Sequence, residues 1–129
     1  MKLLLDTHAL LWWFVGDTRL SMTAREAMDE AELVSYSVVS LWEIGLKLGG
    51  VGFDFPLVEN WDVALPEMVA QFGVRQQGIE ARHCKLIAEL PTHHGDPFDR
   101  MLIAQSLLEG WRVVGKDKRF DAYGVRRVW

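Results

Sequence analysis

Short apolar runs alternate with helix-length amphipathic segments along almost the whole chain. The strand-like runs cover residues 2–6 (KLLLD), 32–37 (ELVSYS), 74–79 (VRQQGI), 111–115 (WRVVG) and 125–129 (VRRVW). The helical segments cover residues 7–15, 22–31, 40–49, 61–73, 80–90 and 97–110. Continuous apolar runs are typical of strands buried on both faces, and their alternation with helices indicates a parallel sheet. The pattern therefore predicts an α/β fold in which helices cover both faces of a central, mostly parallel sheet.

Polar and helix-breaking residues mark where these segments begin and end. Small hydroxyl side chains at the start of three helices are expected to cap them: Thr7, Ser21 and Ser40. Asp96 followed by Pro97 predicts an N-cap with proline at the first helical position. Pro66 predicts a break within the segment 61–73, because proline removes a helical hydrogen bond. Residues 51–60 are expected to form a loop or a short extended piece.

Length and charge narrow the class of protein. The 129 residues are enough for one domain with a substantial core, and no repeat or linker divides them, so we expect a single domain over 1–129. The net charge of −4 means that nucleic acid would have to bind a local basic patch. The single cysteine, Cys84, excludes an internal disulfide and is expected to be a small core residue.

The apolar N-terminal run does not resemble a targeting segment. Asp6 and His8 interrupt it, and no small-residue cleavage site follows. Both features argue against a signal peptide or a membrane span. We therefore expect a cytoplasmic protein without a membrane role.

Four acidic residues fall where an open parallel sheet places its ligand site, beyond the carboxyl ends of the strands. Asp6 ends the first strand, and Glu43 lies in the first turns of the helix after the second strand. Asp99 lies in the first turn of a strand-flanked helix, and Asp117 follows the strand at 111–115. The occurrence of an acid at all four positions favours one shared site.

Each of these acids also has a purely structural interpretation. Asp6 and Asp117 are common types of turn residue, and Asp99 would interact favourably with a helix dipole. Glu43 completes the capping-box pattern Ser40-x-x-Glu43, and it also stands four residues before Lys47.

A shared site of several carboxylates requires a cation, because like charges at one point repel each other. Oxygen ligands on an open rim suit Mg²⁺ or Mn²⁺, which bind through a few carboxylates together with substrate phosphate. The chemistry that such a site supports is hydrolysis of a phosphodiester bond.

Four stretches resemble, in order and spacing, the PIN-domain proteins and more narrowly the VapC-type toxins of type II toxin–antitoxin modules: LLLDTHALLWW, SLWEIGLK, HHGDPFDRMLIAQ and VVGKDKRFDAYGV. The resemblance covers nearly the whole chain. It implies an α/β/α sandwich and a Mg²⁺- or Mn²⁺-dependent endoribonuclease activity. The catalytic acids of the family map onto Asp6, Glu43, Asp99 and Asp117, and Asp6, Asp99 and Asp117 are the expected metal ligands.

One departure from the family concerns the last aspartate. Many members have Thr or Ser just before it, where this chain has Gly115-Lys116. A hydroxyl group that would help to hold water or metal is therefore missing. The departure puts the ligand geometry of Asp117 in question more than that of Asp6 or Asp99.

The resemblance also implies partners. Typical members cleave structured RNA, often transfer or ribosomal RNA, and so inhibit translation. They usually form homodimers, and a cognate antitoxin with a DNA-binding domain wraps the toxin and holds it inactive. We therefore expect an antitoxin partner, an RNA substrate, a homodimer and a toxin–antitoxin hetero-oligomer.

Several further residues have candidate roles around the acids. Arg100 and the basic cluster of the turn-rich stretch KDKRFDAYG are candidate RNA-phosphate contacts: Arg100, Lys116, Lys118 and Arg119. A surface salt bridge is the alternative for Arg100, and a solvated loop is the alternative for the cluster. Thr7, Ser40 and Asp96 are expected to cap helices and to support the acids. Trp12 and Trp13 are adjacent on one helix, so we expect one of them to contribute to a partner interface.

Two other functional classes remain open. The chain could be a PIN-like scaffold that binds RNA or protein without chemistry, its acids contacting only a basic peptide. It could also be a metal-independent ribonuclease that uses His8, or His93 together with His94. The spacing of these histidines matches no zinc motif, and a loop or packing role is the alternative for each of them.

Overall fold

The computed structural model describes residues 1–50, 55 and 57–129. Its strands are β1 (Lys2–Leu5), β2 (Leu33–Ser37), β3 (Arg75–Gln77), β4 (Arg112–Val114) and β5 (Arg127–Val128). Its α-helices are α1 (Thr7–Val15), α2 (Met22–Glu30), α3 (Val38–Leu48), α4 (Trp61–Gln71), α5 (Ala81–Glu89) and α6 (Pro97–Glu109). The short 3₁₀ helix η1 spans Lys118–Tyr123. The predicted alternation of strands and helices is confirmed.

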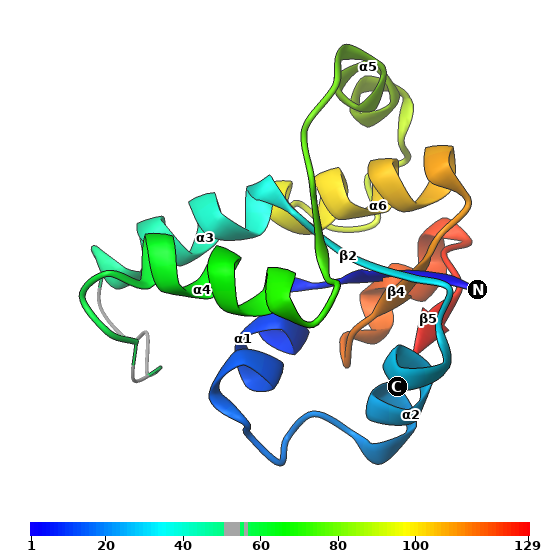
Figure 1. The fold of residues 1–129 in the computed structure, drawn as a ribbon. Helices are drawn as coiled ribbons and strands as arrows, with labels where there is room; N and C mark the ends of the chain where they lie inside the picture. Colours follow the sequence, from blue (N-terminus) through cyan, green and yellow to red (C-terminus); the bar gives the residue numbers. More distant parts are fainter. Residues whose placement is uncertain (51–54, 56) are drawn as a thin grey trace.

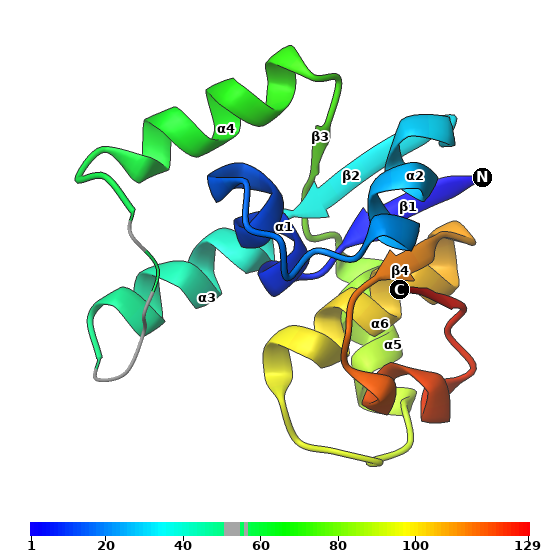
Figure 2. The same cartoon turned by 90° about the horizontal axis from the view of Figure 1, so that it is seen from below.

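The strands form one parallel sheet in the order β3-β2-β1-β4-β5. In Figure 2, β3, β2, β1 and β4 lie in this order from top to bottom. The central strand β1 pairs through Leu4 with Ser35 on one side and with Val113 on the other. Because all strands run the same way, the segments that follow β1, β2 and β4 leave the sheet at the same edge.

Helices cover both faces of this sheet, as the apolar runs predict. Side chains of a strand alternate between the two faces, so Leu3 and Leu5 belong to one buried cluster and Leu4 to the other. The first cluster includes buried side chains of α1, α2 and α4, and the second includes those of α6 and η1. Figure 1 shows α1 and α2 below the sheet, with α6 and then α5 above it. The fold is therefore the expected α/β/α sandwich.

Two predicted helix caps are wrong, and both corrections bear on the site. Asp6, not Thr7, caps α1, because its carboxylate accepts a hydrogen bond from the backbone N–H of Ala9 at 2.8 Å. Ser37, not Ser40, caps α3 through the N–H of Val39 at 3.1 Å. The helix thus begins two residues earlier than predicted, and Ser40 lies inside it. The helix begins after the serine whose hydroxyl reaches a free backbone N–H. The sequence alone does not distinguish Ser37 from Ser40, because both fit the same capping signal.

Two other differences concern irregular segments. Pro66 lies inside α4 without breaking it into two helices, so the predicted break is wrong. Buried Leu65 and Val69 on either side of the proline pack into the core, and this packing offsets the one missing hydrogen bond. Part of the expected loop at 116–124 is the 3₁₀ helix η1. The expected loop at 51–60 lies outside the described residues at 51–54 and 56.

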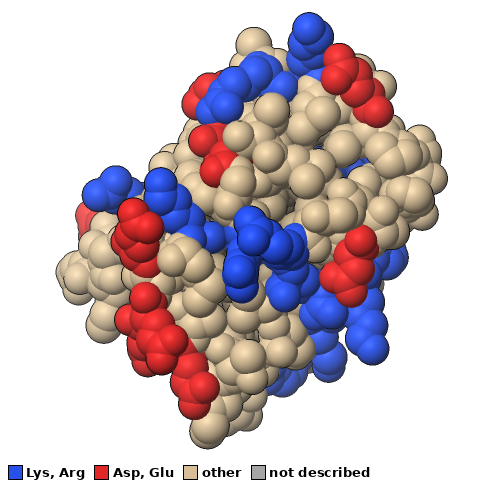
Figure 3. Space-filling view, turned by 90° about the vertical axis from the view of Figure 1, so that its right-hand side faces the viewer, with Lys and Arg blue, Asp and Glu red and all other residues tan. Residues whose placement is uncertain are grey.

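The surface overturns the prediction that Cys84 lies in the core. It leaves the predictions of localisation and of nucleic-acid binding untested. Cys84 is exposed on α5 and is not a core residue, because α5 buries His83 against the neighbouring helix. Among the described residues, no helix is long and apolar enough to cross a membrane. Figure 3 shows the face at the amino-terminal end of β1, where basic and acidic side chains are interspersed. This face therefore does not present the single-sign field that would attract nucleic acid.

Candidate active site

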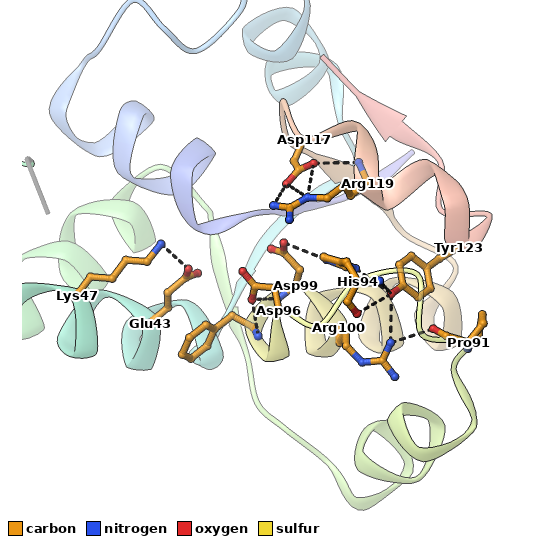
Figure 4. A network of polar contacts seen from close by, with 11 residues as sticks. Glu43, Lys47, Pro91, His94, Asp96, Asp99, Arg100, Asp117, Arg119 and Tyr123 are labelled. Carbon is orange, nitrogen blue, oxygen red and sulfur yellow. Dashed lines mark hydrogen bonds and ion pairs between the residues drawn. The ribbon is translucent and has the colours of Figure 1, made fainter. Parts of the chain in front are cut away.

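Acids from four separate segments line one cavity at the carboxyl ends of the strands. The cavity has a volume of ≈ 150 Å³, and its lining includes all four predicted acids: Asp6, Glu43, Asp99 and Asp117. Thr7, His8, Lys47, Asp96 and Arg119 complete the lining. Figure 4 shows Glu43, Asp99 and Asp117 approaching a common space from α3, α6 and the segment after β4. The structure thus brings together the residues that the strand-end rule selects.

Asp6 is buried, with 6% of its surface exposed. It follows β1 directly, and its cap on α1 fixes the carboxylate at the end of the central strand. Burial raises the pKa of Asp6 to about 7, against the lowering effect of the hydrogen bond from Ala9, and the charges of Asp99, Glu43 and Asp117 raise it further. The carboxylate of Asp6 is therefore held where a negative charge is costly without a cation.

Gly115 lies against the side chain of Asp6, which accounts for the departure from the family pattern. A Cβ atom at position 115 would be 2.8 Å from Cγ of Asp6, closer than real Cβ atoms approach other atoms. The backbone of Gly115 is itself fixed, because its N–H donates to the carbonyl of Val128 at 3.2 Å. A serine or threonine at this position would therefore require Asp6 to move.

Glu43 is buried inside α3 and forms an ion pair with Lys47 one turn later, at 2.8 Å. Its predicted capping role with Ser40 is not observed, because the helix begins at Val38. The hydroxyl of Ser40 instead accepts a hydrogen bond from Thr7 at 2.9 Å, and both side chains are buried. This bond ties the first turn of α1 to α3, and so it fixes Asp6 and Glu43 relative to each other.

Asp117 caps η1 and forms an ion pair with Arg119. Its carboxylate accepts from the backbone N–H of Arg119 at 2.9 Å and from the guanidinium at 2.6 Å. These bonds hold the pKa of Asp117 below its usual value, in contrast to Asp6. Figure 4 shows the guanidinium of Arg119 lying along the carboxylate of Asp117.

Asp99 stands in the first turn of α6, where Asp96 is the N-cap as predicted. The carboxylate of Asp96 accepts from the N–H groups of Phe98 at 2.9 Å and Asp99 at 3.1 Å. Burial, followed by the charge of Asp96, raises the pKa of Asp99 to about 6, and a hydrogen bond from His94 acts in the opposite direction. Nε2 of His94 lies 3.3 Å from Oδ2 of Asp99.

The predicted RNA contacts lie in different surroundings. Lys116 and Lys118 lie on either side of Asp117 and are exposed, and Lys116 lines a second cavity of ≈ 280 Å³ that adjoins Asp6. Arg119 is exposed but paired with Asp117. Arg100 points away from the acids, because its guanidinium donates to the carbonyls of Pro91 and Ile87 and to the hydroxyl of Tyr123. This geometry favours an internal structural role for Arg100 over both phosphate contact and a surface salt bridge.

The two adjacent tryptophans face different parts of the surface. Trp12 is 7% exposed, packs against the ring of Trp129 at 5.6 Å, and lines the cavity of ≈ 280 Å³ together with His8. Trp13 packs edge-on against Phe72 and lines an apolar groove of ≈ 340 Å³ between α1, α2 and α4. A partner interface for either residue stays a prediction.

Sequence reasoning missed the role of Tyr123 at the site, and it expected His8 either to pack or to act in a metal-independent ribonuclease. Tyr123 contacts His94 through its hydroxyl, but the two residues are 29 positions apart and no local pattern connects them. His8 lines both cavities, and its position two residues after Asp6 in a capped helix could have indicated this.

Among the described residues, the one group of three ligand-type side chains whose ligand atoms lie within 4.8 Å of one another is elsewhere, at Glu80, His83 and Glu109. Glu109 is ten residues along α6 from Asp99, which is about 15 Å of helix. Arg82 forms ion pairs with both glutamates of the cluster, so one of their two negative charges is already balanced by a side chain. Nδ1 of His83 accepts a hydrogen bond from the N–H of Glu80 at 2.9 Å, so in the neutral ring Nε2 carries the proton. This cluster therefore ties α5 to α6 and does not replace the predicted site.

The lining of the acidic cavity fits a divalent cation. Five carboxylates face it, against the two basic side chains of Lys47 and Arg119, so three negative charges are in formal excess. The pKa of His8 is lowered by burial and by Lys47, so its ring adds no positive charge at neutral pH. Oxygen donors with excess negative charge suit Mg²⁺ or Mn²⁺.

Comparison with known proteins identifies the family to which the sequence is similar. Residues 3–125 match the PIN domain family. The chain is 30% identical over 131 residues to ribonuclease VapC22 of Mycobacterium tuberculosis, covering 98% of this chain and 97% of that protein.

Solved structures share the fold at lower identity. The toxin–antitoxin complex VapBC2 from Rickettsia felis, bound to a DNA fragment from its promoter, aligns over the full length of both chains with a TM-score of 0.72 and 11% identity. VapC20 from Mycobacterium tuberculosis, described as a toxin that cleaves the sarcin–ricin loop, aligns over 95% of each chain with a TM-score of 0.67 and 20% identity. From the match over nearly its whole length, this chain belongs to the PIN-domain family and, within it, to the VapC-type toxin ribonucleases.

Proposed function

We propose that this chain is a Mg²⁺- or Mn²⁺-dependent endoribonuclease and the toxin of a type II toxin–antitoxin module. The observation that carries the proposal is the cavity in which four acids from four segments meet, at the carboxyl ends of a parallel sheet. The charge excess in this cavity requires a cation, and an open rim leaves room for a phosphodiester beside it.

Each acid has a distinct role in this proposal. Asp6, Asp99 and Asp117 would hold the metal, and a bound Mg²⁺ or Mn²⁺ would supply screening of charge on the phosphate and lower the pKa of an attacking water. Glu43 lines the same cavity, and its carboxylate, held by Lys47 at 2.8 Å, would orient that water. Arg119 now contacts both oxygens of Asp117, and a turn of its guanidinium toward the phosphate of the substrate would free them for the metal.

The substrate would be a structured RNA, transfer or ribosomal RNA, whose cleavage inhibits translation. Exposed Lys116 and Lys118 next to Asp117 provide sequence-independent contacts to phosphate. These contacts reconcile an RNA substrate with a net charge of −4. The solved toxin structure described as cleaving the sarcin–ricin loop supports this class of substrate.

The partners would be a cognate antitoxin and a second copy of the chain. Several solved relatives with this fold are toxin–antitoxin complexes, including VapBC from Salmonella typhimurium, with a TM-score of 0.69 and 16% identity. A basic side chain of the antitoxin would find a strongly negative cavity. We expect a homodimer that joins the antitoxin in a hetero-oligomer.

The central experiment removes single carboxylates without changing their shape. Asp6→Asn and Asp99→Asn are each expected to reduce cleavage of total cellular RNA by roughly a hundredfold or more and to abolish growth inhibition. EDTA should stop cleavage by the unaltered chain, and Mn²⁺ in excess should restore it. Asp62→Asn, at an exposed acid in the first turn of α4, is the matched control. Cleavage that persists in both site variants would refute the proposal.

The same assays separate the alternatives. A non-catalytic scaffold would show no acid-dependent binding of Mn²⁺ in calorimetry and no cleavage. A metal-independent ribonuclease would tolerate EDTA and leave 2′,3′-cyclic phosphate ends. The structure disfavours the second alternative for His94, because Tyr123 and Asp99 engage its two ring nitrogens.

A further inference from the structure

A chain of polar contacts leads from the end of α5 to the carboxylate of Asp99. Nη1 and Nη2 of Arg100 donate to the carbonyls of Pro91 at 2.9 Å and Ile87 at 3.2 Å, at the C-terminal end of α5. Nη1 also donates to the hydroxyl of Tyr123 at 3.1 Å. The same hydroxyl lies 2.8 Å from Nδ1 of His94, whose Nε2 lies 3.3 Å from Oδ2 of Asp99. Figure 4 shows these side chains in sequence, ending at the acidic cavity.

The hydrogen-bond partners in this chain favour one placement of the proton on a neutral imidazole. The hydroxyl of Tyr123 accepts from Arg100 and from the backbone N–H of His94 at 3.1 Å, which uses both of its lone pairs. Its single proton has two acceptors within reach, Nδ1 of His94 at 2.8 Å and the backbone carbonyl of His94 at 3.3 Å, and the shorter contact favours Nδ1. Nδ1 is therefore an acceptor, and the ring proton lies on Nε2, where it points at Asp99.

Burial of His94 and Asp99 helps to keep the ring in this tautomer. The side chain of His94 is 8% exposed and that of Asp99 is 16% exposed, so water has little access to reorient the ring. In the opposite tautomer the hydroxyl could donate to the carbonyl of His94, but Nδ1–H would then be a third donor to an oxygen whose two lone pairs are used, and a bare Nε2 would face a carboxylate. Both contacts would be repulsive.

We propose that His94 is the positioning residue of Asp99, and that Tyr123 and Arg100 fix the tautomer that directs an N–H at one carboxylate oxygen. This bond engages Oδ2 of Asp99, so Oδ1 is the oxygen that would be offered to a metal. A hydrogen-bonded neighbour of this kind orients a ligand and tunes its basicity. The metal-binding consequence rests on the proposed function of Asp99, whereas the tautomer itself does not.

The first test is spectroscopic and needs no activity. Two-bond ¹H–¹⁵N correlation spectra of the metal-free protein distinguish the two tautomers of a neutral imidazole. We expect His94 to show the pattern of the Nε2–H form and Tyr123→Phe to change it to a mixed pattern. Tyr36→Phe is the matched control. The hydroxyl of Tyr36 donates to Gln76 at 2.9 Å, and these residues lie on β2 and β3, on the opposite side of β1 from β4. An Nδ1–H pattern in the unaltered protein would overturn the proposal.

The second test measures the dissociation constant for Mn²⁺ by calorimetry. His94→Asn, which has no donor that reaches the Nε2 position, is expected to weaken binding by about 10- to 100-fold. His94→Gln carries its amide nitrogen near that position and should lose less than about tenfold. Equal losses in both variants would show that the ring only fills space. Asp62→Asn, at the exposed acid in the first turn of α4, should change nothing.

The two proposals fail in distinguishable ways. If Asp99→Asn leaves Mn²⁺ binding unchanged, the proposed metal role of Asp99 is wrong, and the spectra still decide the tautomer. If Asp99→Asn abolishes binding and Tyr123→Phe leaves the tautomer unchanged, the metal role stands and the positioning role is wrong.

Discussion

At the scale of single residues, Asp6 combines a structural and a chemical role that conflict in the absence of a cation. As the N-cap of α1, its carboxylate must accept a hydrogen bond from Ala9. As a buried acid near three others, it resists ionisation, and its pKa rises to about 7. The cap needs only an acceptor oxygen, whereas a metal site needs the charge. The two roles can therefore be separated by a substitution that keeps the oxygen.

Asp6→Asn is expected to stabilise the metal-free protein above neutral pH. The folded protein holds the proton of Asp6 more tightly than the unfolded chain does, because the pKa of about 7 exceeds the usual value of 3.8. The unaltered protein therefore loses stability as pH rises from about 4 to about 7, and the full loss persists above that range. The variant avoids this loss, which amounts to at most about 4 kcal/mol.

Urea denaturation at several pH values measures this effect. The advantage of Asp6→Asn should be largest at about pH 8 and should shrink toward zero at about pH 4. Asp6→Ala removes the cap as well, so it should be less stable than Asp6→Asn by about 1 kcal/mol. A pH-independent difference between Asp6→Asn and the unaltered protein would contradict the burial argument.

Gly115 gives a second prediction at this scale. Gly115→Ser is expected to lower the free energy of unfolding by about 1–3 kcal/mol, because the new Cβ forces the carboxylate of Asp6 off Ala9. It should also weaken Mn²⁺ binding, although serine is a residue type that the family pattern allows before the last aspartate. Gly78→Ala is the control, since a Cβ there meets nothing within 4 Å. Equal stability of Gly115→Ser and the unaltered protein would show that Asp6 adapts at no cost.

At the scale of elements, the N-terminus of α6 places Asp99. Asp96 and Pro97 set the start of the helix, and this start directs Asp99 into the cavity from the first turn. The free N–H groups of a helix start favour nearby negative charge, which offsets part of the repulsion between Asp96 and Asp99. The charge of Asp96 nevertheless helps to raise the pKa of Asp99 to about 6.

Two substitutions of Asp96 separate its cap from its charge. Asp96→Ala is expected to cost about 1 kcal/mol of stability, because the N–H groups of Phe98 and Asp99 lose their acceptor. Asp96→Asn keeps an acceptor oxygen and should cost much less. Both should lower the pKa of Asp99, which ¹³C-detected titration of its carboxylate measures. A pKa unchanged in both variants would show that Asp96 does not act on Asp99 through its charge.

At the scale of the whole molecule, the parallel sheet is what makes the acids neighbours. The segments after β1, β2 and β4 leave the same edge of the sheet, and α6 begins at that edge. The excess charge that collects there belongs to the folded state alone, because the unfolded chain separates these acids widely along its length. A cation that binds this cavity must therefore stabilise the fold.

Mn²⁺ is accordingly expected to raise the thermal stability of the chain. At a free concentration about one hundred times the dissociation constant, the gain is about 2.7 kcal/mol. The gain should be larger at about pH 8 than at about pH 5, because protons compete for Asp6 and Asp99, whose pKa values are about 7 and about 6. Differential scanning calorimetry with and without Mn²⁺ measures it. An equal gain in Asp6→Asn would place the ion elsewhere, for example at Glu80, His83 and Glu109.

A contact in this protein is predictable from the sequence when the residues that form it are close together in the chain. The cap at Asp96 is predictable because cap, proline and first turn are adjacent in the chain. The predicted cap at Ser40 is wrong because Ser37 offers the same local signal three residues earlier. The contact of Tyr123 with His94 joins positions 29 apart, so nothing local announces it. Arg100 looks like a phosphate contact in the sequence, because its carbonyl partners at the end of α5 become neighbours only in the fold.

The amino-acid sequence by itself determined the order of strands and helices and the rim on which the acids stand. These follow from hydrophobic period, caps and chain connectivity, which depend on residues a few positions apart. Only the tertiary structure decided that Asp6 is buried against Gly115, that Arg100 donates to carbonyls at the end of α5, and that His94 points at Asp99. Desolvation and Coulomb energy depend on distance in space, and the fold alone sets that distance.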